Sequence, residues 1–341
     1  MNNKLLITFA LLAYNQERFI REALEGAFSQ TYTPLEIILS DDCSTDNTFE
    51  SMKEMATAYH GPHNIILNRN DQNLGIGAHI NRVMEIAKGK LIVAAAGDDI
   101  SLPHRVEKIY QAYKSTEGTA KSIFSNSLII DATGKPCFLQ FETPVRTESF
   151  HLEKIIINDF MITGCSNAWD REVYDVFGPL ITPLTVEDKV IAFRSTLLGQ
   201  IEYIHEALVM HRRHDRNVWH YRMKTDIERD IAFEKFWIFE KKAIYKNYIN
   251  DMKTVEKISP DKKDEIKHYQ AILYERLLDI EEHIRMINGQ FIEKLGILAK
   301  NIFKKGMKFR TIRHEIGFFL LPKIYRKYIA VKNKINGLYR K

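Results

Sequence analysis

The stretch LEIILSDDCSTDNT, residues 35–48, joins a short, mostly apolar run to a turn that opens on two adjacent carboxylates, Asp41 and Asp42. A short apolar run bounded by turn residues is typical of a buried strand. Neighbouring carboxylates repel one another, so such a pair at the end of a strand indicates that something uses it. The stretch therefore predicts a buried strand with a functional site at its carboxyl end.

The same succession of strand, turn and helix recurs through the first hundred residues. Strands separated by helices of this length pair in parallel through right-handed crossovers, which predicts an α/β fold with a mostly parallel sheet flanked by helices. The apolar runs and helical spacings predict strands at residues 5–13, 35–40, 65–67 and 91–96, and helices at residues 17–29, 45–59 and 75–88.

The pattern changes in the second half of the chain. Beyond residue 226 the sequence is almost entirely helical, and Ser259 followed by Pro260 is typical of a helix start. We therefore expect an α/β domain at residues 1–222 and a helical C-terminal region at residues 223–341. Between these parts we expect a strand and hairpin at residues 122–140 with the turn ATGK, a helix at residues 187–198 and a strand at residues 201–211.

A second acidic pair, Asp98 and Asp99, follows the predicted strand 91–96. Ligands of parallel sheets bind beyond the carboxyl ends of the strands, where both acidic pairs are expected to lie. Carboxylate oxygens together with substrate phosphates are the ligands that Mg²⁺ or Mn²⁺ prefers. One Asp of a pair can instead cap the following helix. Two pairs at equivalent strand ends favour a divalent cation and a phosphate-bearing ligand.

Three segments of the chain carry a series of motifs in a fixed order. The segments are LLAYNQERFIREALEGAFSQTYTPLEIILSDDCSTDNT (residues 11–48), NLGIGAHIN (residues 73–81) and AAAGDDISLP (residues 94–103). They hold a strand ending in Tyr-Asn, a helix closing on Ser-Gln-Thr, an Asp-Asp-x-Ser-x-Asp turn, an Asn-x-Gly segment and an Asp motif followed by Pro. In this order the motifs resemble the family 2 glycosyltransferases of the GT-A fold. The resemblance spans about residues 5–215 and implies a Rossmann-like, mostly parallel sheet, followed here by the helical region.

What the resemblance implies is a nucleotide-sugar site with Mg²⁺ or Mn²⁺. Asp42 would hydrogen-bond the nucleotide base, for which uracil is the first candidate, and the Tyr14 ring would stack beside it. Asp98 would contact the ribose or diphosphate, and Asp99 would hold the metal ion. The implied donor-binding residues are Tyr14, Asn15, Asp42, Asn73 and Asp98.

The segment HRRHDRNVWH, residues 211–220, is similar to an Arg-x-His segment of the family. This similarity implies His214 as a further metal ligand, with Arg212 or Arg213 facing the diphosphate. A solvated basic loop is the alternative.

The chain also departs from the family pattern at three positions. Cys43 and Asn47 stand where glycine is usual, and Ala96 stands where many members carry the first Asp of the metal motif.

On the acceptor side, an inverting sugar transfer needs a carboxylate that takes the proton of the attacking hydroxyl. Glu187 and Asp188 begin the predicted helix at residues 187–198, and the resemblance points to Asp188 as the base, with Arg194 a turn or two later. Acidic residues at a helix start are also favoured by the helix dipole. In TGCSNAWDRE, residues 163–172, Trp169 either stacks on a sugar or belongs to the core.

The C-terminal tail is strongly basic. Residues 294–341 hold fourteen basic residues and one acidic residue, Glu315, a net charge of +13 that leaves −8 for residues 1–293 out of the total of +5. Lys and Arg mixed with aromatic and aliphatic residues suit the surface of an anionic membrane. A helical bundle packed on the acidic body and a nucleic-acid patch are alternatives, the last disfavoured because no binding module accompanies the charge.

The cysteines and the apolar runs indicate the cellular compartment in which we expect the protein. Three widely spaced cysteines suggest neither a disulfide framework nor a zinc knuckle. No apolar run reaches the ~18 residues of a membrane span, and the N-terminus predicts a strand in place of a signal peptide. We expect a cytoplasmic protein, peripheral on the inner face of the bacterial plasma membrane.

These observations favour an inverting, metal-dependent glycosyltransferase of surface polysaccharide (O-antigen or capsule) assembly. Its substrates would be a nucleotide-sugar, such as a UDP-sugar, and a saccharide or lipid-linked saccharide. A sugar nucleotidyltransferase would need a Gly-rich basic loop after the first strand, where AYNQERF (residues 13–19) stands. The remaining alternative is a catalytically degenerate nucleotide-sugar-binding or membrane-docked scaffold.

Overall fold

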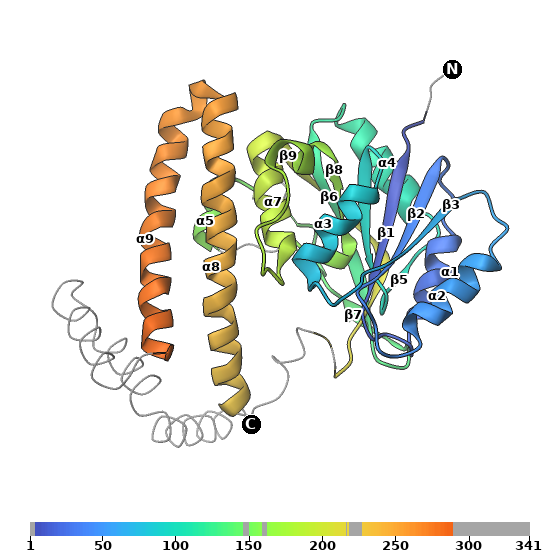
Figure 1. The fold of residues 1–341 in the computed structure, drawn as a ribbon. Helices are drawn as coiled ribbons and strands as arrows, with labels where there is room; N and C mark the ends of the chain where they lie inside the picture. The colour runs from blue at the N-terminus through green and yellow to red at the C-terminus, as the bar shows by residue number, and fades with distance from the viewer. Residues whose placement is uncertain (1–3, 146–149, 159–161, 216, 218–226, 289–341) are drawn as a thin grey trace. The chain divides into compact units, whose positions relative to one another are not determined.

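The structure is a computed structural model that describes residues 4–145, 150–158, 162–215, 217 and 227–288 (Figure 1). The chain forms two compact units, one of residues 1–214 and 246–270 and the other of residues 215–245 and 271–341. The boundary predicted after residue 222 and the basic tail at residues 294–341 lie outside the described residues, so both stay predictions.

A nine-stranded sheet is the centre of the first unit. Its order is β3-β2-β1-β4-β8-β6-β9-β5, with β7 paired to β6. The strands are β1 (Ile7–Ala13), β2 (Leu35–Asp41), β3 (Asn64–Arg69), β4 (Leu91–Ala96), β5 (Ile100–Ser101), β6 (Ala120–Ile130), β7 (Pro136–Leu139), β8 (Asn167–Asp170) and β9 (Gln200–Arg212).

Helices lie between these strands, as the alternating pattern predicts. They are α1 (Ile20–Phe28), α2 (Thr48–Thr57), α3 (Ile76–Ile86), α4 (Arg105–Ser115), α5 (Leu152–Asn158), α6 (Glu172–Phe177) and α7 (Glu187–Leu198), with the short 3-10 turn η2 (Gly164–Ser166) before β8.

The sheet has a parallel and a mixed half. Strands β3, β2, β1 and β4 are parallel neighbours, which confirms the predicted α/β class. In the other half β8 runs antiparallel to β4 and β6, β5 runs antiparallel to β9, and β6 pairs in parallel with β9. The hairpin expected at residues 122–140 is formed by β6 and β7.

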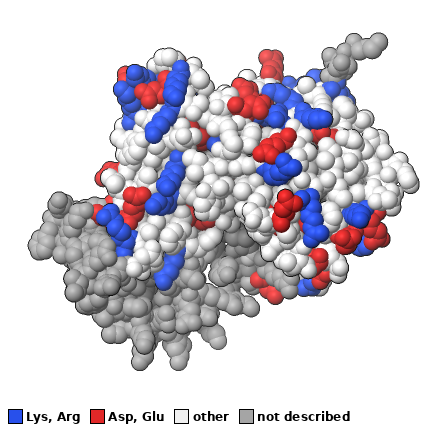
Figure 2. Space-filling model, in the orientation of Figure 1, with Lys and Arg blue, Asp and Glu red and all other residues white. Residues whose placement is uncertain are grey.

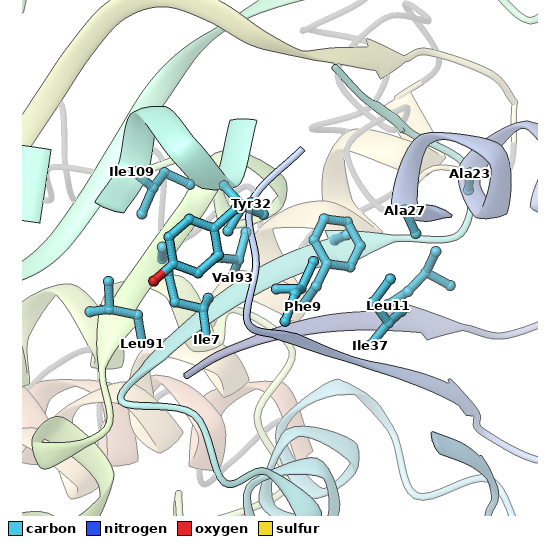
Figure 3. Packing of buried hydrophobic residues seen from close by; sticks show 14 of the residues in the cluster. Ile7, Phe9, Leu11, Ala23, Ala27, Tyr32, Ile37, Leu91, Val93 and Ile109 are labelled. Carbon is cyan, nitrogen blue, oxygen red and sulfur yellow. The ribbon is translucent and has the colours of Figure 1, made fainter. Parts of the chain in front are cut away.

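Both faces of the parallel half are buried. On one face Ile7, Phe9 and Leu11 of β1 join Ile37 of β2 and Val93 of β4 in a cluster that α1 and α4 cover (Figure 3). The intervening residues of the same strands, Ala10, Ile38 and Ile92, are buried as well. Burial on both faces explains why these strands read as continuous apolar runs without alternation.

A buried carboxylate stabilises the amino end of the parallel strands. Glu36 of β2 accepts hydrogen bonds from Thr8 Oγ1 and from the backbone N–H groups of Lys88 and Gly89. A Cβ at Gly89 would lie 2.3 Å from the backbone nitrogen of Thr8. Helix α3 already ends at Ile86, and Gly89 is needed for a different reason, because only glycine lets the chain pass this close to β1.

Two long helices follow, α8 (Ile227–Ile258) and α9 (Lys263–Asn288), joined by η4 (Pro260–Lys262), which agrees with the helix start predicted at Ser259 and Pro260. Residues 246–270 pack within the first unit, where Asp251 binds Arg194 and Tyr248 stacks on Phe193 at 3.8 Å between ring centroids. Within the second unit, Lys242 and Glu281 form an ion pair of 3.1 Å.

Acidic and basic side chains are interspersed over the face of the described residues that Figure 2 shows. Exposed ion pairs such as Arg82–Glu85, 2.7 Å apart, occur in the described part of the chain. Within the described part of the chain, no helix combines the length and the apolar character that a bilayer crossing requires.

Candidate functional site

The two acidic pairs lie at one edge of the sheet. Ala13 of β1 is level with Asp41 of β2, and Leu12 is level with Ala96 of β4. Because these strands are parallel and in the same register, residues 14–15, Asp42 and residues 97–99 all follow at the carboxyl edge. The sequence prediction that both pairs share this edge is confirmed.

Asp42 is buried and is fixed by three donors. Its Oδ1 accepts hydrogen bonds from Asn70 Nδ2 (2.8 Å) and from the backbone N–H of Leu74 (2.9 Å), and its Oδ2 accepts one from the backbone N–H of Gly75 (2.9 Å). A carboxylate has about four acceptor positions. Oδ2 of Asp42 therefore retains capacity for one further N–H donor.

A chain of polar side chains orients this carboxylate from behind. Asn68 donates to the side-chain oxygens of Asn70 (3.1 Å) and Ser40 (2.9 Å), and Ser40 is hydrogen-bonded to His79 Nε2 (2.6 Å). Burial lowers the pKa of His79, so the imidazole is held neutral. These residues were not predicted, because single Asn and His residues in a strand and a helix carry no pattern.

The turns beside Asp42 depend on unusual backbone conformations. Asn15 and Cys43 have φ angles of 53° and 61°, in the left-handed region. Cys43 stands where the family pattern has glycine, which adopts this region at no steric cost. Asn15 is held by Ser44 Oγ, which accepts from its backbone N–H, and by the backbone N–H of Thr45, which donates to its Oδ1.

Two of the remaining implied donor-binding residues, Tyr14 and Asn73, differ in exposure from Asp42. The ring of Tyr14 is 44% exposed and is therefore free to stack on a planar ligand. Asn73 is exposed, and its Oδ1 accepts a hydrogen bond from the backbone N–H of Gly75 at 3.1 Å. Asn73 thus shapes the loop whose N–H groups hold Asp42.

Asp98 and Asp99 have different partners. Oδ2 of Asp98 is 2.9 Å from His214 Nε2, and the His214 ring packs on Phe19. Oδ1 of Asp99 accepts the backbone N–H of Arg212 at 2.8 Å. Burial raises the pKa of Asp99 to about 6, helped by the negative charge of Asp98. His214, implied as a metal ligand, is therefore paired with Asp98 here and stays a prediction in that role.

The side chains nearest Asp99 form a candidate metal-binding group. Asp99, Cys165 and His211 each present a ligand atom, and these atoms lie within 4.8 Å of one another. His211 Nδ1 is buried and makes no hydrogen bond to any described residue. An oxygen, a nitrogen and a sulfur donor around one point suit a divalent transition metal ion. The residues present therefore fit the implied cation.

Asp188 stands at the start of α7 and is buried. Its Oδ1 accepts the backbone N–H of Lys189 at 2.8 Å, and the backbone N–H of Gly164 also donates to the carboxylate. Burial raises the pKa of Asp188 to about 6, against the opposing effect of the Lys189 ammonium and these hydrogen bonds. A carboxylate with this pKa is suited to accept a proton near neutral pH.

The turn η2 connects Asp188 with the metal-binding group. Gly164 contacts Asp188: a Cβ atom added to this glycine would lie 3.6 Å from Asp188 Oδ2. The next residue, Cys165, donates a hydrogen bond from its thiol to Asp99. The contact of Cys165 with Asp99 was not predicted from the sequence.

Three other residues from the sequence analysis have structural positions. Trp169 is buried on β8 and belongs to the core, so stacking on a sugar is excluded for it in this conformation. The Arg212 guanidinium is buried against Glu22 Oε2 (2.9 Å) and the carbonyl of Asp98 (2.9 Å). Arg213 is exposed over the Phe138 ring, so it is the one of the two arginines that can reach a ligand.

Comparison with known proteins agrees with this geometry. Residues 8–131 match the family model described as Glycosyl transferase family 2. This range holds β1 to β4 and the two acidic pairs.

The chain is also similar in sequence to several curated proteins. Uncharacterized protein Rv1520 of Mycobacterium tuberculosis is 26% identical over 211 residues, covering 61% of this chain and 59% of the relative. The putative glycosyltransferase EpsE of Bacillus subtilis is 36% identical over 32% of this chain and 38% of its own. WcaA of Escherichia coli, a putative colanic acid biosynthesis glycosyl transferase, is 27% identical over 46% and 57%. The chain thus spans less than two thirds of the length of each.

A solved structure shares the fold. The S. aureus TarS fragment 1–349, in complex with UDP-GlcNAc, aligns with a TM-score of 0.50 and 14% identity, covering 89% of this chain and 93% of that one. The family match at residues 8–131 covers both acidic pairs. These comparisons support a glycosyltransferase domain of family 2 in this chain, with the family match at residues 8–131.

Proposed function

We propose that this protein is an inverting, divalent-metal-dependent glycosyltransferase that moves a sugar from a nucleotide-sugar to a hydroxyl of a saccharide. The observation that carries the proposal is the turn η2, whose adjacent residues Gly164 and Cys165 contact Asp188 and Asp99. A buried carboxylate suited to a base therefore lies beside a group suited to a cation. In an inverting sugar transfer, the first accepts the proton of the attacking hydroxyl and the second stabilises the charge of the leaving diphosphate.

The donor is proposed to lie along the carboxyl edge of the sheet. The remaining acceptor position on Asp42 Oδ2 would take an N–H of the base, and the exposed Tyr14 would stack beside it. Asn15 and Asn73 would hold the surrounding turns, and Asp98 would contact the ribose or diphosphate. TarS, which shares the fold, was solved with UDP-GlcNAc. This supports a UDP-sugar as the first donor class to test.

In the reaction, the acceptor hydroxyl oxygen forms a bond to the anomeric carbon while the bond from that carbon to the diphosphate oxygen breaks. The hydroxyl proton passes to the Asp188 carboxylate, and attack from the face opposite the leaving group inverts the anomeric centre. Asp99 and His211, with His214 as a further candidate, would hold the cation. When bound, Mg²⁺ or Mn²⁺ supplies stabilisation of the negative charge that develops on the diphosphate.

The acceptor is proposed to be a saccharide or lipid-linked saccharide of surface polysaccharide assembly, such as O-antigen or capsule. The name of WcaA, a colanic acid biosynthesis transferase, supports this class. The charge of +13 in residues 294–341 supports a peripheral position on the cytoplasmic face of the bacterial plasma membrane.

Membrane binding is tested by deleting residues 294–341. We expect the full chain to sediment with vesicles containing anionic lipid and the shortened chain to stay in the supernatant, because each Lys or Arg near such a surface contributes about 1 kcal/mol. Neutral vesicles are the control. Undiminished sedimentation of the shortened chain would refute the role of the tail.

The donor site is tested by thermal shift with UDP-, GDP-, CMP- and dTDP-sugars, with and without Mn²⁺. A ligand that binds only the folded state raises the apparent melting temperature. We expect one nucleotide class to do so in a metal-dependent way, and Asp99→Ala to remove the effect. Asp188→Asn should keep the donor shift and lower kcat by about 10²–10⁴. Unchanged function in Asp188→Asn would favour the alternative, a catalytically degenerate scaffold.

A further inference from the structure

The donor set around Asp99 is unusual for a site that holds Mg²⁺. Magnesium prefers six oxygen ligands, several of them waters, whereas a thiolate and an imidazole suit softer transition metal ions. In this chain the carboxylate of Asp99 has one sulfur neighbour and one nitrogen neighbour, Cys165 and His211. Building on the function proposed above, we propose that Cys165 is a third metal ligand, which makes the site select a transition metal ion such as Mn²⁺, Co²⁺ or Zn²⁺ over Mg²⁺.

Geometry is the first support. A metal ion binds sulfur at about 2.3 Å and nitrogen or oxygen at about 2.0–2.2 Å, so two ligand atoms of one ion lie at most about 4.5 Å apart. The ligand atoms of Asp99, Cys165 and His211 are all within 4.8 Å of one another. Small rotamer adjustments therefore place all three around one ion.

The hydrogen bonds of the three side chains are the second support. The Cys165 thiol donates to the Asp99 carboxylate, and His211 Nδ1 is buried with no partner among residues 4–145, 150–158, 162–215, 217 and 227–288. A buried polar nitrogen without a hydrogen bond is costly and rare. A metal ion that replaces the thiol proton satisfies the carboxylate and the sulfur together.

A buried cation next to the group is the third support. Arg105 is fully buried and donates to Ser101 Oγ (2.9 Å) and the carbonyl of Ala94 (2.7 Å), but to no carboxylate in the described part of the chain. The acidic groups that act on its pKa are Cys165 and Asp99, and Cys165 is a neutral thiol here because burial and the neighbouring Asp99 raise its pKa. The positive charge of Arg105 would stabilise both the Asp99 carboxylate and a metal-bound thiolate at Cys165. A site made of oxygen ligands alone would not need this additional charge.

The test is Co²⁺ binding to the full chain, followed by absorption spectroscopy without nucleotide or acceptor. A cobalt–thiolate bond gives an intense near-ultraviolet charge-transfer band that oxygen and nitrogen ligands do not give. We expect this band in the wild type and its loss in Cys165→Ser. Calorimetric titration should show Co²⁺ affinity reduced by about tenfold or more in Cys165→Ser, with Mg²⁺ affinity unchanged.

The other two cysteines provide the matched control. In the double variant Cys43→Ser with Cys137→Ser, Cys165 is the sole remaining thiol of the chain. The band must persist in this variant, which also decides the question if Cys165→Ser does not fold. Absence of the band from the wild type, its loss from the double variant or its persistence in Cys165→Ser would each overturn the proposal. Sugar transfer is measured separately, so failure of the proposed function is recognised independently.

Discussion

At the scale of single residues, Asp42 shows how a site carboxylate also serves the structure. Its three donors come from Asn70 and from the backbone at Leu74 and Gly75. In Asp42→Asn, the side-chain NH₂ group would replace one acceptor oxygen and would meet at least one of these N–H donors, so that hydrogen bond would be lost. We expect a loss of about 1–3 kcal/mol in the free energy of unfolding and about tenfold weaker UDP binding, measured by urea unfolding and calorimetry.

The matched control for this change is Asp71→Asn, in the same loop but exposed. It alters the net charge equally and removes no side-chain contact that the structure shows. Equal effects of the two substitutions on UDP binding would contradict a specific role for Asp42.

Asp188 predicts a dependence of stability on pH. An unfolded aspartate titrates near pH 4, whereas burial raises the pKa of Asp188 to about 6. The folded protein thus binds this proton more tightly, and the free energy of unfolding falls as the pH rises from about 4 to about 6. Asp188→Asn should therefore be more stable than the wild type above pH 6, by on the order of 3 kcal/mol, and equally stable below about pH 4.

Urea unfolding at a series of pH values measures this difference. Glu187→Gln, the same change one residue earlier, should leave the slope of stability against pH in place. If Asp188→Asn were no more stable than the wild type at pH 8, the interpretation of Asp188 as a carboxylate destabilised by burial would be wrong.

The sequence predicted the carboxylates of the site better than their neighbours. Asp42, Asp98 and Asp99 follow strands whose apolar runs are plain, so their shared edge could be predicted. The histidine beside Asp99 could not. Strand β9 changes register against β6 at Asn126 and on either side of it, so simple alternation does not tell which of residues 211–214 faces the site. Cys165 approaches Asp99 only through tertiary contacts.

At the scale of elements, length decided what could be predicted. The runs that became β1, β2 and β4 have six or seven residues, and the helix predicted at residues 187–198 forms with these bounds. Strand β8 has four residues and β5 has two, too few for a periodic pattern. The antiparallel pairs in which these two strands take part were therefore missed.

The link between α3 and β4 gives a prediction at this scale. We expect Gly89→Ala to lower the free energy of unfolding by about 3 kcal/mol, because the new Cβ would meet the Thr8 backbone nitrogen at 2.3 Å. Gly178→Ala is the control, since it has a φ of 73° but no atom within 4 Å of the added Cβ, and should cost about 1 kcal/mol. Urea unfolding measures the free energy of unfolding of both variants. Equal losses would show that the backbone of β1 moves enough to accommodate the added Cβ at residue 89.

At the scale of the whole molecule, one buried ion pair holds the segment 246–270 in the first unit. Arg194 of α7 binds both carboxylate oxygens of Asp251 at 2.8 and 3.1 Å, and both side chains are almost fully buried. Removing one partner leaves a buried charge without compensation. We expect Arg194→Met or Asp251→Leu alone to cost about 3–5 kcal/mol in the free energy of unfolding.

The double variant distinguishes the pair from simple packing. With both charges removed, the total loss should be well below the sum of the two single losses, as a double-mutant cycle measures. Additive losses would mean that the two residues contribute independently. This contact could not be predicted, because the two residues lie 57 positions apart and a sequence of helical character beyond residue 226 favours a separate region.

The turn η2 fixes a dimension of the proposed reaction. Gly164 and Cys165 contact the two key carboxylates, and the Cα atoms of adjacent residues are about 3.8 Å apart. The spacing between the group that receives the proton and the group that would bind the leaving diphosphate is thus set by one peptide unit. Surrounding loops can lengthen, shorten or exchange residues without altering it. On such a scaffold, substitutions in the surrounding loops can change the fit of an acceptor and leave the spacing of the two carboxylates in place.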